Sequence, residues 1–524
     1  MKKILAFLLV LVMITGVFAG CGSEKPPASG NTPSPSPENA QTGNPLDAPG
    51  SLSFLVIQQA GAPLSESMPV MKELSTRTNT KLTFTNVPKA DMATKVQTLV
   101  AANQLPDVVE YETENQGTDL VNYLESGTFI YLNDYLTKEK TPNITALFEK
   151  YPSYKKDMTT DDGKIPGLAQ LTERQWRCDW VINNTFLTEL NMTAPTNLDE
   201  LYNYLVAVKQ KYPDATPMGV GPWAGDRNAI VRPIMYAFNV TNEWWLYNDD
   251  SYLYGPYEKQ EEYKAALKYI NKLYTEGLID PEFFSISAEA TNSKISNNKV
   301  GILYGWADGY GQWGKNGTWG IDMIPCTPIK GPDGNAYMRG NPRMAVQPHY
   351  LTKNCKDINR AIAFFDYCYS EEATDLLNWG IEGTHYMTIN GERQYTDSIM
   401  KHDQGYVIGR YAQGLAHPRF PMIINAQAEL IVNGPETAKH VEYMKQGTIM
   451  PGIPQLYSTT EEEEKYKEIY ADISNLYKLY EGKLITSKGD FDTIFAEYMA
   501  MLEAEQVKEM IEIKHAQYER YKAR

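Results

Sequence analysis

The segment 263–313 constrains the fold more than any other part of the chain. Apolar side chains recur at three- and four-residue steps from 263 to 274, which predicts an amphipathic helix, and Gly277 then supplies a stop. A turn and a polar segment follow, before a short apolar run over 299–304 that predicts a buried strand. Trp306 comes directly after this strand. Because ligand crevices of open α/β sheets lie outside the carboxyl ends of the strands, Trp306 is a candidate ligand contact.

Residues 51–110 predict the core of one sheet. Short apolar runs alternate here with stretches that have helical periodicity, an order typical of strand–helix–strand units and a parallel sheet. Gln58, Glu110 and Tyr111 stand at the ends of two of the strands, so they are candidate ligand contacts. The expected elements are a strand over 51–58, a helix over 69–76, a strand over 81–87, a helix over 93–102 and a strand over 105–110.

Residues 1–20 have the three parts of a secretory signal: two lysines, an apolar stretch over 4–14, and small residues before Cys21. The apolar stretch is too short to span a bilayer. Ala19-Gly20-Cys21 resembles a bacterial lipobox, in which the cysteine becomes the lipidated first residue, although Phe18 replaces the usual aliphatic residue. The alternative is an ordinary cleavable signal followed by a chance cysteine.

Residues 21–50 are rich in Pro, Ser, Gly and Asn and nearly free of large apolar side chains. Such a stretch cannot bury a core, so it predicts a disordered, partly extended linker. Together with Cys21 it is expected to hold a folded region away from a membrane surface.

The remaining chain is too long for one ordinary core and predicts two domains. A formal net charge of −16 without a basic patch makes nucleic acid an unsuitable partner. The chain has 36 Tyr and 9 Trp against 15 Phe, an excess of rings that carry a polar group, and such rings stack on sugars. The alternative for most of these rings is ordinary half-buried packing.

Cysteine and histidine spacing gives no sign of a metal centre or a cofactor. The cysteines after residue 21 show no C-x-x-C spacing, and the six histidines are scattered along the chain. Disulfide bonds and buried free thiols both remain open for Cys178, Cys326, Cys355 and Cys368, with buried thiols slightly favoured. A structural calcium ion also remains open.

Several motifs, taken in order, resemble the extracellular solute-binding lipoproteins of carbohydrate ABC importers. They include LPDVVE, GTFIYLNDYL, DGKIPG, LYTEGLIDPE, NNKVGILYGW, NWGIEGTHY and IPQLYSTTEE. The resemblance implies an α/β fold of the two-lobed periplasmic-binding-protein type II, in which each lobe is a mixed sheet flanked by helices and the ligand cleft lies at the hinge. The implied lobes are 51–167 with 341–400, and 168–340 with 401–524.

The resemblance also implies site residues, and in one place the chain departs from the pattern. Where relatives commonly read Arg-Lys-Asp-Trp-Leu, this chain has Asn183 to Phe186, which puts the usual arginine in doubt and makes Trp176, Arg177 and Trp180 the candidates nearby. Trp223 lies on a loop after a predicted strand, where packing in the core is an equal alternative.

The motif NWGIEGTHY supplies further candidates: Trp379, Glu382, His385 and Tyr386. Structural roles for Glu382 and His385 are equally open. The sequence predicts that Trp306 and Trp379 form an opposed pair that grips a neutral or weakly charged oligosaccharide, because sugar rings pack their C–H faces on aromatic rings.

Such proteins bind by closure of two lobes and deliver the solute to membrane permease subunits. The expected protein is a monomer, lipid-anchored at the outer face of the bacterial cytoplasmic membrane. A secreted carbohydrate-active enzyme is the rival reading, and it would need two carboxylates at a suitable separation. Candidates for these are Glu110, Glu173, Asp179 and Glu382. A sensory partner of a membrane receptor is a third possibility.

Overall fold

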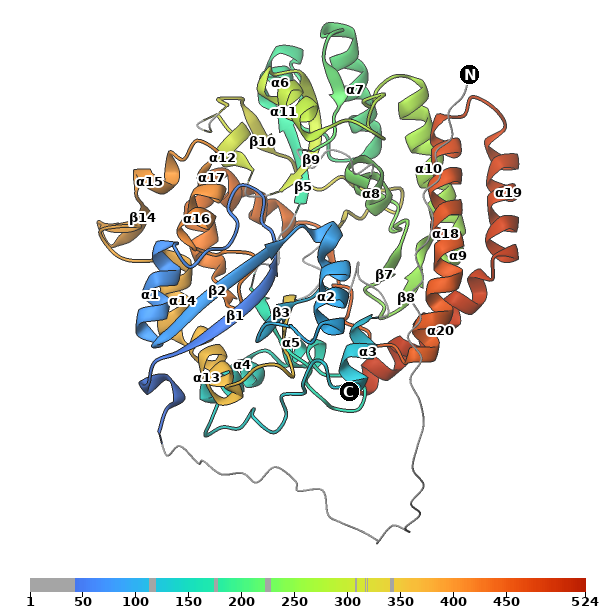
Figure 1. Cartoon of the computed structure of the whole chain (residues 1–524). Coiled ribbons are helices and arrows are strands. Elements are labelled where there is room, and N and C mark those ends of the chain that lie inside the picture. The colour runs from blue at the N-terminus through green and yellow to red at the C-terminus, as the bar shows by residue number, and fades with distance from the viewer. Residues whose placement is uncertain are drawn as a thin grey trace, which may run out of the picture. The chain divides into compact units, whose positions relative to one another are not determined.

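The apolar runs of the chain pair into two main sheets (Figure 1). In the computed structural model, which describes residues 43–112, 119–173, 178–221, 228–306, 309–315, 317, 319–339 and 344–524, residues 44–524 form one compact unit. The larger sheet has the strand order β15-β4-β12-β3-β1-β2 and the smaller has β10-β5-β9-β6. The strands of the larger sheet are β1 (Gly50–Ile57), β2 (Thr80–Val87), β3 (Val108–Glu110), β4 (Leu168–Thr172), β12 (Ala345–Leu351) and β15 (Ile423–Ile424).

The six-stranded sheet contains the predicted strand–helix–strand units. β1 pairs in parallel with both β2 and β3, as the alternation of strands and helices over 51–110 predicted. β12 runs antiparallel between β3 and β4, and β15 is parallel to β4. The carboxyl ends of β1, β2, β3, β4 and β15 therefore all lie at one edge of the sheet.

Helices on this sheet bury a large apolar core that combines residues from 46 to 171 with residues from 345 to 424. We call residues 44–172 and 344–424 the six-stranded half. Its helices are η1 (Pro45–Asp47), α1 (Pro69–Arg77), η2 (Lys89–Asp91), α2 (Met92–Ala101), α3 (Asp119–Glu125), α4 (Pro142–Lys150), α5 (Pro152–Asp157), α13 (Ile358–Cys368), α14 (Glu371–Trp379), α15 (Asp397–Met400) and α16 (Tyr406–Gln413), and it also holds the hairpin β13 (Tyr386–Ile389) and β14 (Glu392–Tyr395).

The four-stranded sheet is built around the strand predicted before Trp306. β9 pairs antiparallel with β5 and parallel with β6, and β10 completes the order. Its strands are β5 (Cys178–Asn183), β6 (Thr216–Met218), β9 (Val300–Trp306) and β10 (Met323–Pro325). A separate antiparallel hairpin consists of β7 (Trp244–Leu246) and β8 (Tyr252–Tyr254).

The helix predicted from residue 263 is present as α10 (Gln260–Thr275), and its buried residues are those of the predicted stripe, from Tyr263 to Leu273. Apolar residues at steps of three and four occupy one face, so this face packs into the core. The other helices that precede residue 340 are α6 (Asn184–Leu190), α7 (Leu198–Lys211), α8 (Asn228–Ala237), α9 (Gly255–Glu258), α11 (Ala288–Ser296) and α12 (Tyr310–Trp313).

The C-terminal helices complete the same core. α18 packs on α10 and is in turn covered by α19 and α20, an arrangement visible in Figure 1. These helices are α17 (Ala426–Met444), α18 (Thr460–Thr486), α19 (Phe491–Ala504) and α20 (Val507–Ala523). Gln506 adopts a left-handed conformation, φ 61°, and separates α19 from α20. We call residues 178–339 and 426–524 the four-stranded half.

Two glycines permit close approach of backbone in the four-stranded half. A Cβ on Gly255 would lie 1.9 Å from the carbonyl oxygen of Thr241, and a Cβ on Gly331 would lie 1.5 Å from that of Ala237. Both distances are far below van der Waals contact, and both obstacles are backbone atoms that cannot rotate away. Only glycine fits at either position.

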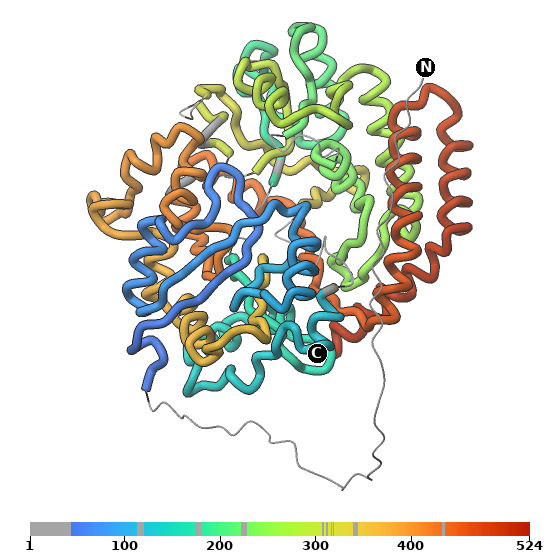
Figure 2. Tube along the Cα trace, viewed as in Figure 1, coloured from blue at the N-terminus to red at the C-terminus, as the bar shows by residue number. Residues whose placement is uncertain are grey.

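The predicted lobe boundaries differ from the membership of the two sheets. β4 begins at Leu168, just after the predicted crossing at 167, yet it pairs with β12 of the six-stranded sheet. The segment 401–424 supplies β15 and buried residues to the same half, and Figure 2 shows this late part of the chain beside the N-terminal strands.

Two short strands of late and middle sequence form a small separate sheet, β11 (Tyr337–Arg339) with β16 (Thr448–Met450). Among the described residues, no helix is both long and apolar enough to cross a bilayer. None of Cys178, Cys326, Cys355 and Cys368 forms a disulfide bond.

Candidate functional site

Charged side chains gather at the edge of the six-stranded sheet where its parallel strands end. Glu110 closes β3 and is fully buried, and its Oε2 accepts a hydrogen bond of 2.9 Å from the N–H of Ile57 at the end of β1. Arg419 donates through one nitrogen to Glu110 Oε1 at 2.9 Å and to Glu112 Oε1 at 2.6 Å. Glu112 also pairs with Lys89. These contacts fix the ends of two strands and hold one arginine between two carboxylates.

Burial and ion pairing shift the two carboxyl pKa values of this cluster in opposite directions. Removal of Glu110 from water raises the pKa of its carboxyl to about 7, although Arg419 and the Ile57 N–H act in the opposite direction. At Glu112 the neighbouring Lys89 and Arg419 outweigh burial and lower the pKa. Glu110 was predicted as a ligand contact from its place at a strand end, and the structure gives it these intramolecular partners.

Two polar groups at the same edge were not predicted. Gln347 lies at the bulge in β12, between Val346 and Pro348, with a left-handed φ of 47°. Its Oε1 and the Nε of Arg419 are buried and have no hydrogen-bond partner among the described residues. Buried polar groups ordinarily find partners, so a polar ligand meeting this edge would complete both. The only sequence signal was the Gln-Pro step inside a strand, which is typical of a bulge.

The edge of the four-stranded sheet presents aromatic residues. Trp306 ends β9 opposite Cys178 of β5, and its indole is half-buried. Two residues earlier, Tyr304 packs edge-on against Trp180 with ring centroids 5.6 Å apart. Trp180 is 4% exposed and belongs to the main core of this half, whereas Trp306 keeps exposed surface.

The chain itself brings these two edges together. β4 ends at Thr172 at the charged edge, and β5 begins at Cys178 opposite Trp306, so six residue steps join the edges. An extended chain covers at most about 3.3–3.6 Å per residue, which limits the span between the two strand ends to about 20 Å. Gln58, exposed directly after β1, lies at the end of a strand next to β3.

Other predicted contacts fall elsewhere. Trp176, Arg177 and Trp223 lie outside the described residues. Tyr111 is fully buried and packs edge-on against Tyr123 and Phe129, with centroids at 5.9 and 6.2 Å.

The NWGIEGTHY residues form a local cluster of their own. Trp379 is 6% exposed and packs against Tyr386 and Tyr395, with the guanidinium of Arg393 5.5 Å from its ring centroid. His385 is buried, and its Nδ1 accepts from the backbone N–H of Ile381 at 3.0 Å.

Glu382 of the same motif is exposed and accepts from the hydroxyl of Thr388 at 2.8 Å. These contacts suffice to hold the hairpin β13–β14 on α14. The predicted pairing of Trp379 with Trp306 across a cleft stays a prediction.

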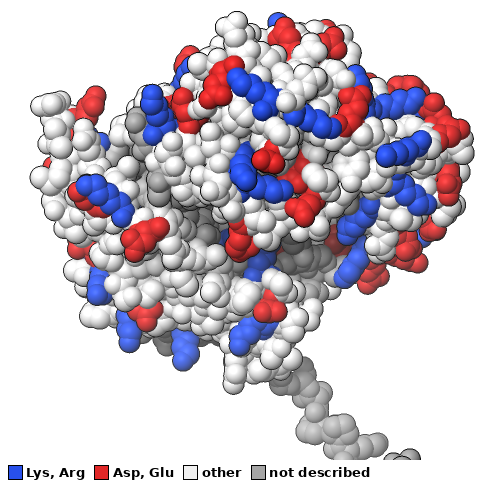
Figure 3. All heavy atoms as spheres, turned by 90° about the horizontal axis from the view of Figure 1, so that it is seen from above, with Lys and Arg blue, Asp and Glu red and all other residues white. Residues whose placement is uncertain are grey.

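The surface of the described chain carries both signs of charge. On the face seen in Figure 3, Lys and Arg side chains are interspersed with Asp and Glu. Among the described residues, no group of three or more His, Cys, Asp or Glu side chains is arranged to hold a metal ion.

Comparison with known proteins places this arrangement in a family. The chain is 25% identical to the fructooligosaccharide ABC transporter substrate-binding protein FusA of Streptococcus pneumoniae serotype 4, over 98% of both chains. It is 27% identical to the polygalacturonan/rhamnogalacturonan-binding protein YtcQ of Bacillus subtilis, over 73% of this chain and 74% of that one.

Solved structures agree on the fold. The crystal structure of the alginate-binding protein AlgQ2 without calcium ion matches 90% of this chain and 98% of its own, with a TM-score of 0.74 at 23% identity. The predicted mixed α/β fold of solute-binding proteins is thereby confirmed. The family model for bacterial extracellular solute-binding proteins matches residues 62–375, more than half of the chain. The chain belongs to the bacterial extracellular solute-binding proteins.

Proposed function

We propose that this protein captures an oligosaccharide between the edges of its two sheets and delivers it to the membrane subunits of an ABC importer. The observation that carries the proposal is that a charged edge lies close to the half-buried indole of Trp306. At the charged edge, Gln347 Oε1 and Arg419 Nε are buried and have no hydrogen-bond partner within the described part of the chain. Sugars need both kinds of partner, because their hydroxyls take hydrogen bonds while their C–H faces pack on rings. The names of the relatives FusA and YtcQ support a carbohydrate ligand.

The distribution of strands supports two lobes with revised boundaries. We assign 44–172 with 344–424 to one lobe and 178–339 with 426–524 to the other, since each set shares a sheet and a core. The cleft then lies where the chain crosses between them. Ligand that contacts both lobes favours the closed form by its differential affinity, and the permease recognises that form.

Trp306→Ala tests the site. If the ring is buried against a sugar, its loss costs about 1–3 kcal/mol of binding, roughly ten- to a hundredfold in Kd. Calorimetry with a panel of neutral and acidic oligosaccharides would measure this for the wild type and the variant. Tyr202→Ala, which removes a half-buried ring from α7, is the matched control and should bind as the wild type does. Unchanged affinity in Trp306→Ala would remove the indole from the site, and tight binding of a peptide without any glycan response would overturn the sugar assignment.

The role as a binding protein, not an enzyme, is tested on the same panel. Incubation of each bound oligosaccharide with the protein should release no new reducing ends. Cleavage that is lost in Glu110→Gln would instead favour the carbohydrate-active enzyme.

Membrane attachment through Cys21 completes the proposal. The segment Ala19-Gly20-Cys21 and the following linker support a lipid anchor, because two or more acyl chains hold a protein stably at a membrane. Cys21→Ala should move the protein from the membrane fraction to the medium, as judged by immunoblotting of both fractions. Retention of the variant in the membrane fraction would refute the anchor.

A further inference from the structure

A pocket of about 340 Å³ lies where α3 of the six-stranded half meets the C-terminal helices. Its walls are different residues from those at the strand ends described above. The lining includes Val121 of α3, Trp244 of β7, Tyr252 of β8, Tyr466 of α18, Lys514 of α20 and the segment 453–458. Both halves of the molecule therefore contribute to it.

Aromatic rings form one side of the pocket. Trp244 stacks on Tyr252 with centroids 5.3 Å apart and an interplanar angle of 20°, and its Nε1 donates to the hydroxyl of Tyr466 at 3.2 Å. Tyr466 in turn stacks on Tyr470, whose side chain is 42% exposed at the rim. These rings hold one another in place, so their faces are ordered before any ligand arrives.

Lys514 brings a cation to this aromatic wall. Its Nζ lies 4.3 Å from the centroid of the Tyr466 ring and donates to Gln517 Oε1 at 3.0 Å. None of the carboxylates in the described residues forms an ion pair with Lys514, although an ammonium has three hydrogens to donate. Burial lowers the pKa of this amine to about 8, although the nearby carboxylates of Glu463 and Glu462 act in the opposite direction.

The remaining charges around the pocket nearly cancel. Glu463 and Lys467 line it with opposite signs. Glu462, which is also near, is held by Arg520 in contacts of 2.6 and 2.8 Å. Lys514 therefore sets the sign of the pocket, which favours an anionic group.

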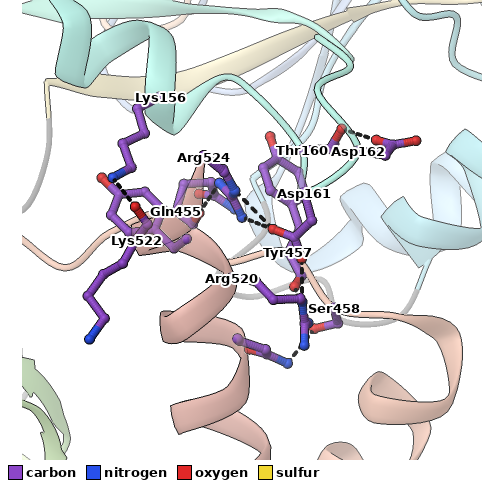
Figure 4. Close-up of polar contacts among 12 residues, drawn as sticks. Lys156, Thr160, Asp161, Asp162, Gln455, Tyr457, Ser458, Arg520, Lys522 and Arg524 are labelled. Carbon is purple, nitrogen blue, oxygen red and sulfur yellow. Dashed lines mark hydrogen bonds and ion pairs between the residues drawn. The ribbon is translucent and has the colours of Figure 1, made fainter.

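The far wall is held rigidly by α20. Arg524 donates to the carbonyl oxygen of Gln455 at 3.1 Å, and Arg520 donates to that of Tyr457 at 3.3 Å. Gln517, the partner of Lys514, also donates to Ser458 Oγ at 3.0 Å. Figure 4 shows Arg520 and Arg524 reaching the segment that carries Gln455, Tyr457 and Ser458.

We propose that this pocket is a subsite for a sugar unit that bears a carboxylate, with the ring against the aromatic wall and the carboxylate on Lys514. The inference rests on the proposed function, of which it specifies one part of the ligand. The volume is at the small end of the range of about 300–1,000 Å³ found for ligand pockets, which suits a short saccharide. A carboxylate supplies the ion pair that Lys514 lacks, and ordered rings supply the apolar contact.

The test compares uronic-acid trisaccharides with their neutral counterparts. Trimers of galacturonic, glucuronic, mannuronic and guluronic acid are titrated by calorimetry beside the same trimers with each carboxyl reduced to an alcohol. In the wild type, at least one acid should bind about tenfold tighter than its reduced form, a difference of about 1.4 kcal/mol. Lys514→Met should bring this ratio close to one and leave the neutral trimer unaffected.

Two further variants test whether the preference for the acid depends on this pocket and on Lys514 in particular. Val121→Trp fills the pocket while it keeps Lys514, and it should abolish the preference for the acid as well. Lys508→Met removes an exposed cation of the same helix that pairs with Glu503, and it should keep the preference. Far-UV circular dichroism of each variant confirms folding.

The outcomes separate the two proposals. If neutral trimers bind but no acid is preferred, or if the preference survives in both Lys514→Met and Val121→Trp, the subsite is overturned while oligosaccharide capture stands. If no saccharide in this set or in the wider glycan panel binds, oligosaccharide capture fails and the subsite fails with it.

Discussion

Four histidines are buried, and burial lowers the pKa of each of them, most strongly for three. Burial lowers the pKa of His349 and His417 to about 4 and that of His440 to about 3. His417, for example, accepts from the backbone N–H of Arg419 at 3.2 Å and donates to the carbonyl oxygen of Ala62 at 2.9 Å. The positive charge of Arg419 further lowers the pKa of His349 and His417. An unfolded histidine takes up a proton near pH 6.5, so acid favours the unfolded chain at these positions.

We expect the melting temperature to fall as the pH drops from 6.5 to 4. Between these values the unfolded state binds more protons at each of the three most strongly shifted histidines, and the loss at pH 4 is on the order of 3 kcal/mol per residue. Glu110 acts in the opposite direction, because its raised pKa lets the folded state gain a proton between about pH 7 and 4.5. Asp366 and His515, whose pKa values are also raised, act in the same direction as Glu110, whereas the lowered pKa of His385 adds to the loss. The large shifts of His349, His417 and His440 leave a net loss.

His440→Gln should show a smaller fall in melting temperature between pH 7 and pH 4.5 than the wild type. Tyr310→Phe is the control, because it removes the hydroxyl that lies 3.0 Å from His440 Nδ1 and keeps the titrating ring. Scanning calorimetry at the two pH values measures the difference. The same pH-dependent loss in His440→Gln and the wild type would contradict the assignment.

For single residues, the sequence predicted the place along a strand or helix better than the side chains that the residue contacts. Glu110 could be placed at a strand end from the apolar run before it, but Arg419 lies 309 residues further along the chain. Nothing local to either residue indicates the pair, because the contact exists only when β3 and the segment before β15 share one edge. Lys514 was missed for the same reason, since its rings come from β7, β8 and α18.

Elements with strong periodicity were predicted well, and short ones were not. The helix from residue 263 could be predicted because its apolar residues recur at steps of three and four over several turns. The strand before Trp306 could be predicted because its apolar run is several residues long. β15 has two residues and β16 has three, too few for any period, and their register depends on distant strands. The break at Gln506 interrupts a pattern that reads as continuous helix.

A capping box holds the start of α18. Thr459 accepts from the N–H of Glu462 at 3.2 Å, and the Glu462 carboxylate accepts from the N–H of Thr459 at 3.0 Å. Thr459→Ala should lower the free energy of unfolding by about 1 kcal/mol, because a helix N–H loses its acceptor. Thr459→Ser keeps the hydroxyl and should stay near the wild type in urea titration. Equal losses in both variants would assign the effect to packing of the methyl group instead.

In the whole molecule, α20 ties the two halves together. Asp161, in the turn before β4, accepts from Arg520 Nε and from an Arg524 guanidinium nitrogen, each at 2.6 Å (Figure 4). The side chain of Arg524 is 4% exposed. Because Arg520 also binds Glu462, one helix connects the six-stranded half to the start of α18.

Asp161→Asn should enlarge the ligand-free protein in small-angle scattering, since it weakens a contact that spans the two halves. Bound oligosaccharide should then compact both the variant and the wild type, and raise the melting temperature by mass action. Asp492→Asn is the control: its partners Lys264 and Lys268 lie in the same half, so the radius of gyration should not change. A confirmed tight ligand without compaction would count against hinged lobes.

The close backbone contacts at Gly255 and Gly331 determine how substitutions at these two positions would score in a saturation mutagenesis screen. Any side chain there collides with a carbonyl oxygen, so every substitution will score as a loss of uptake. In a growth selection on the transported sugar, both positions will therefore rank beside true contact residues such as those proposed around Trp306. Counting the protein at the cell surface for each variant separates the two classes, because glycine variants disappear while contact variants persist without uptake.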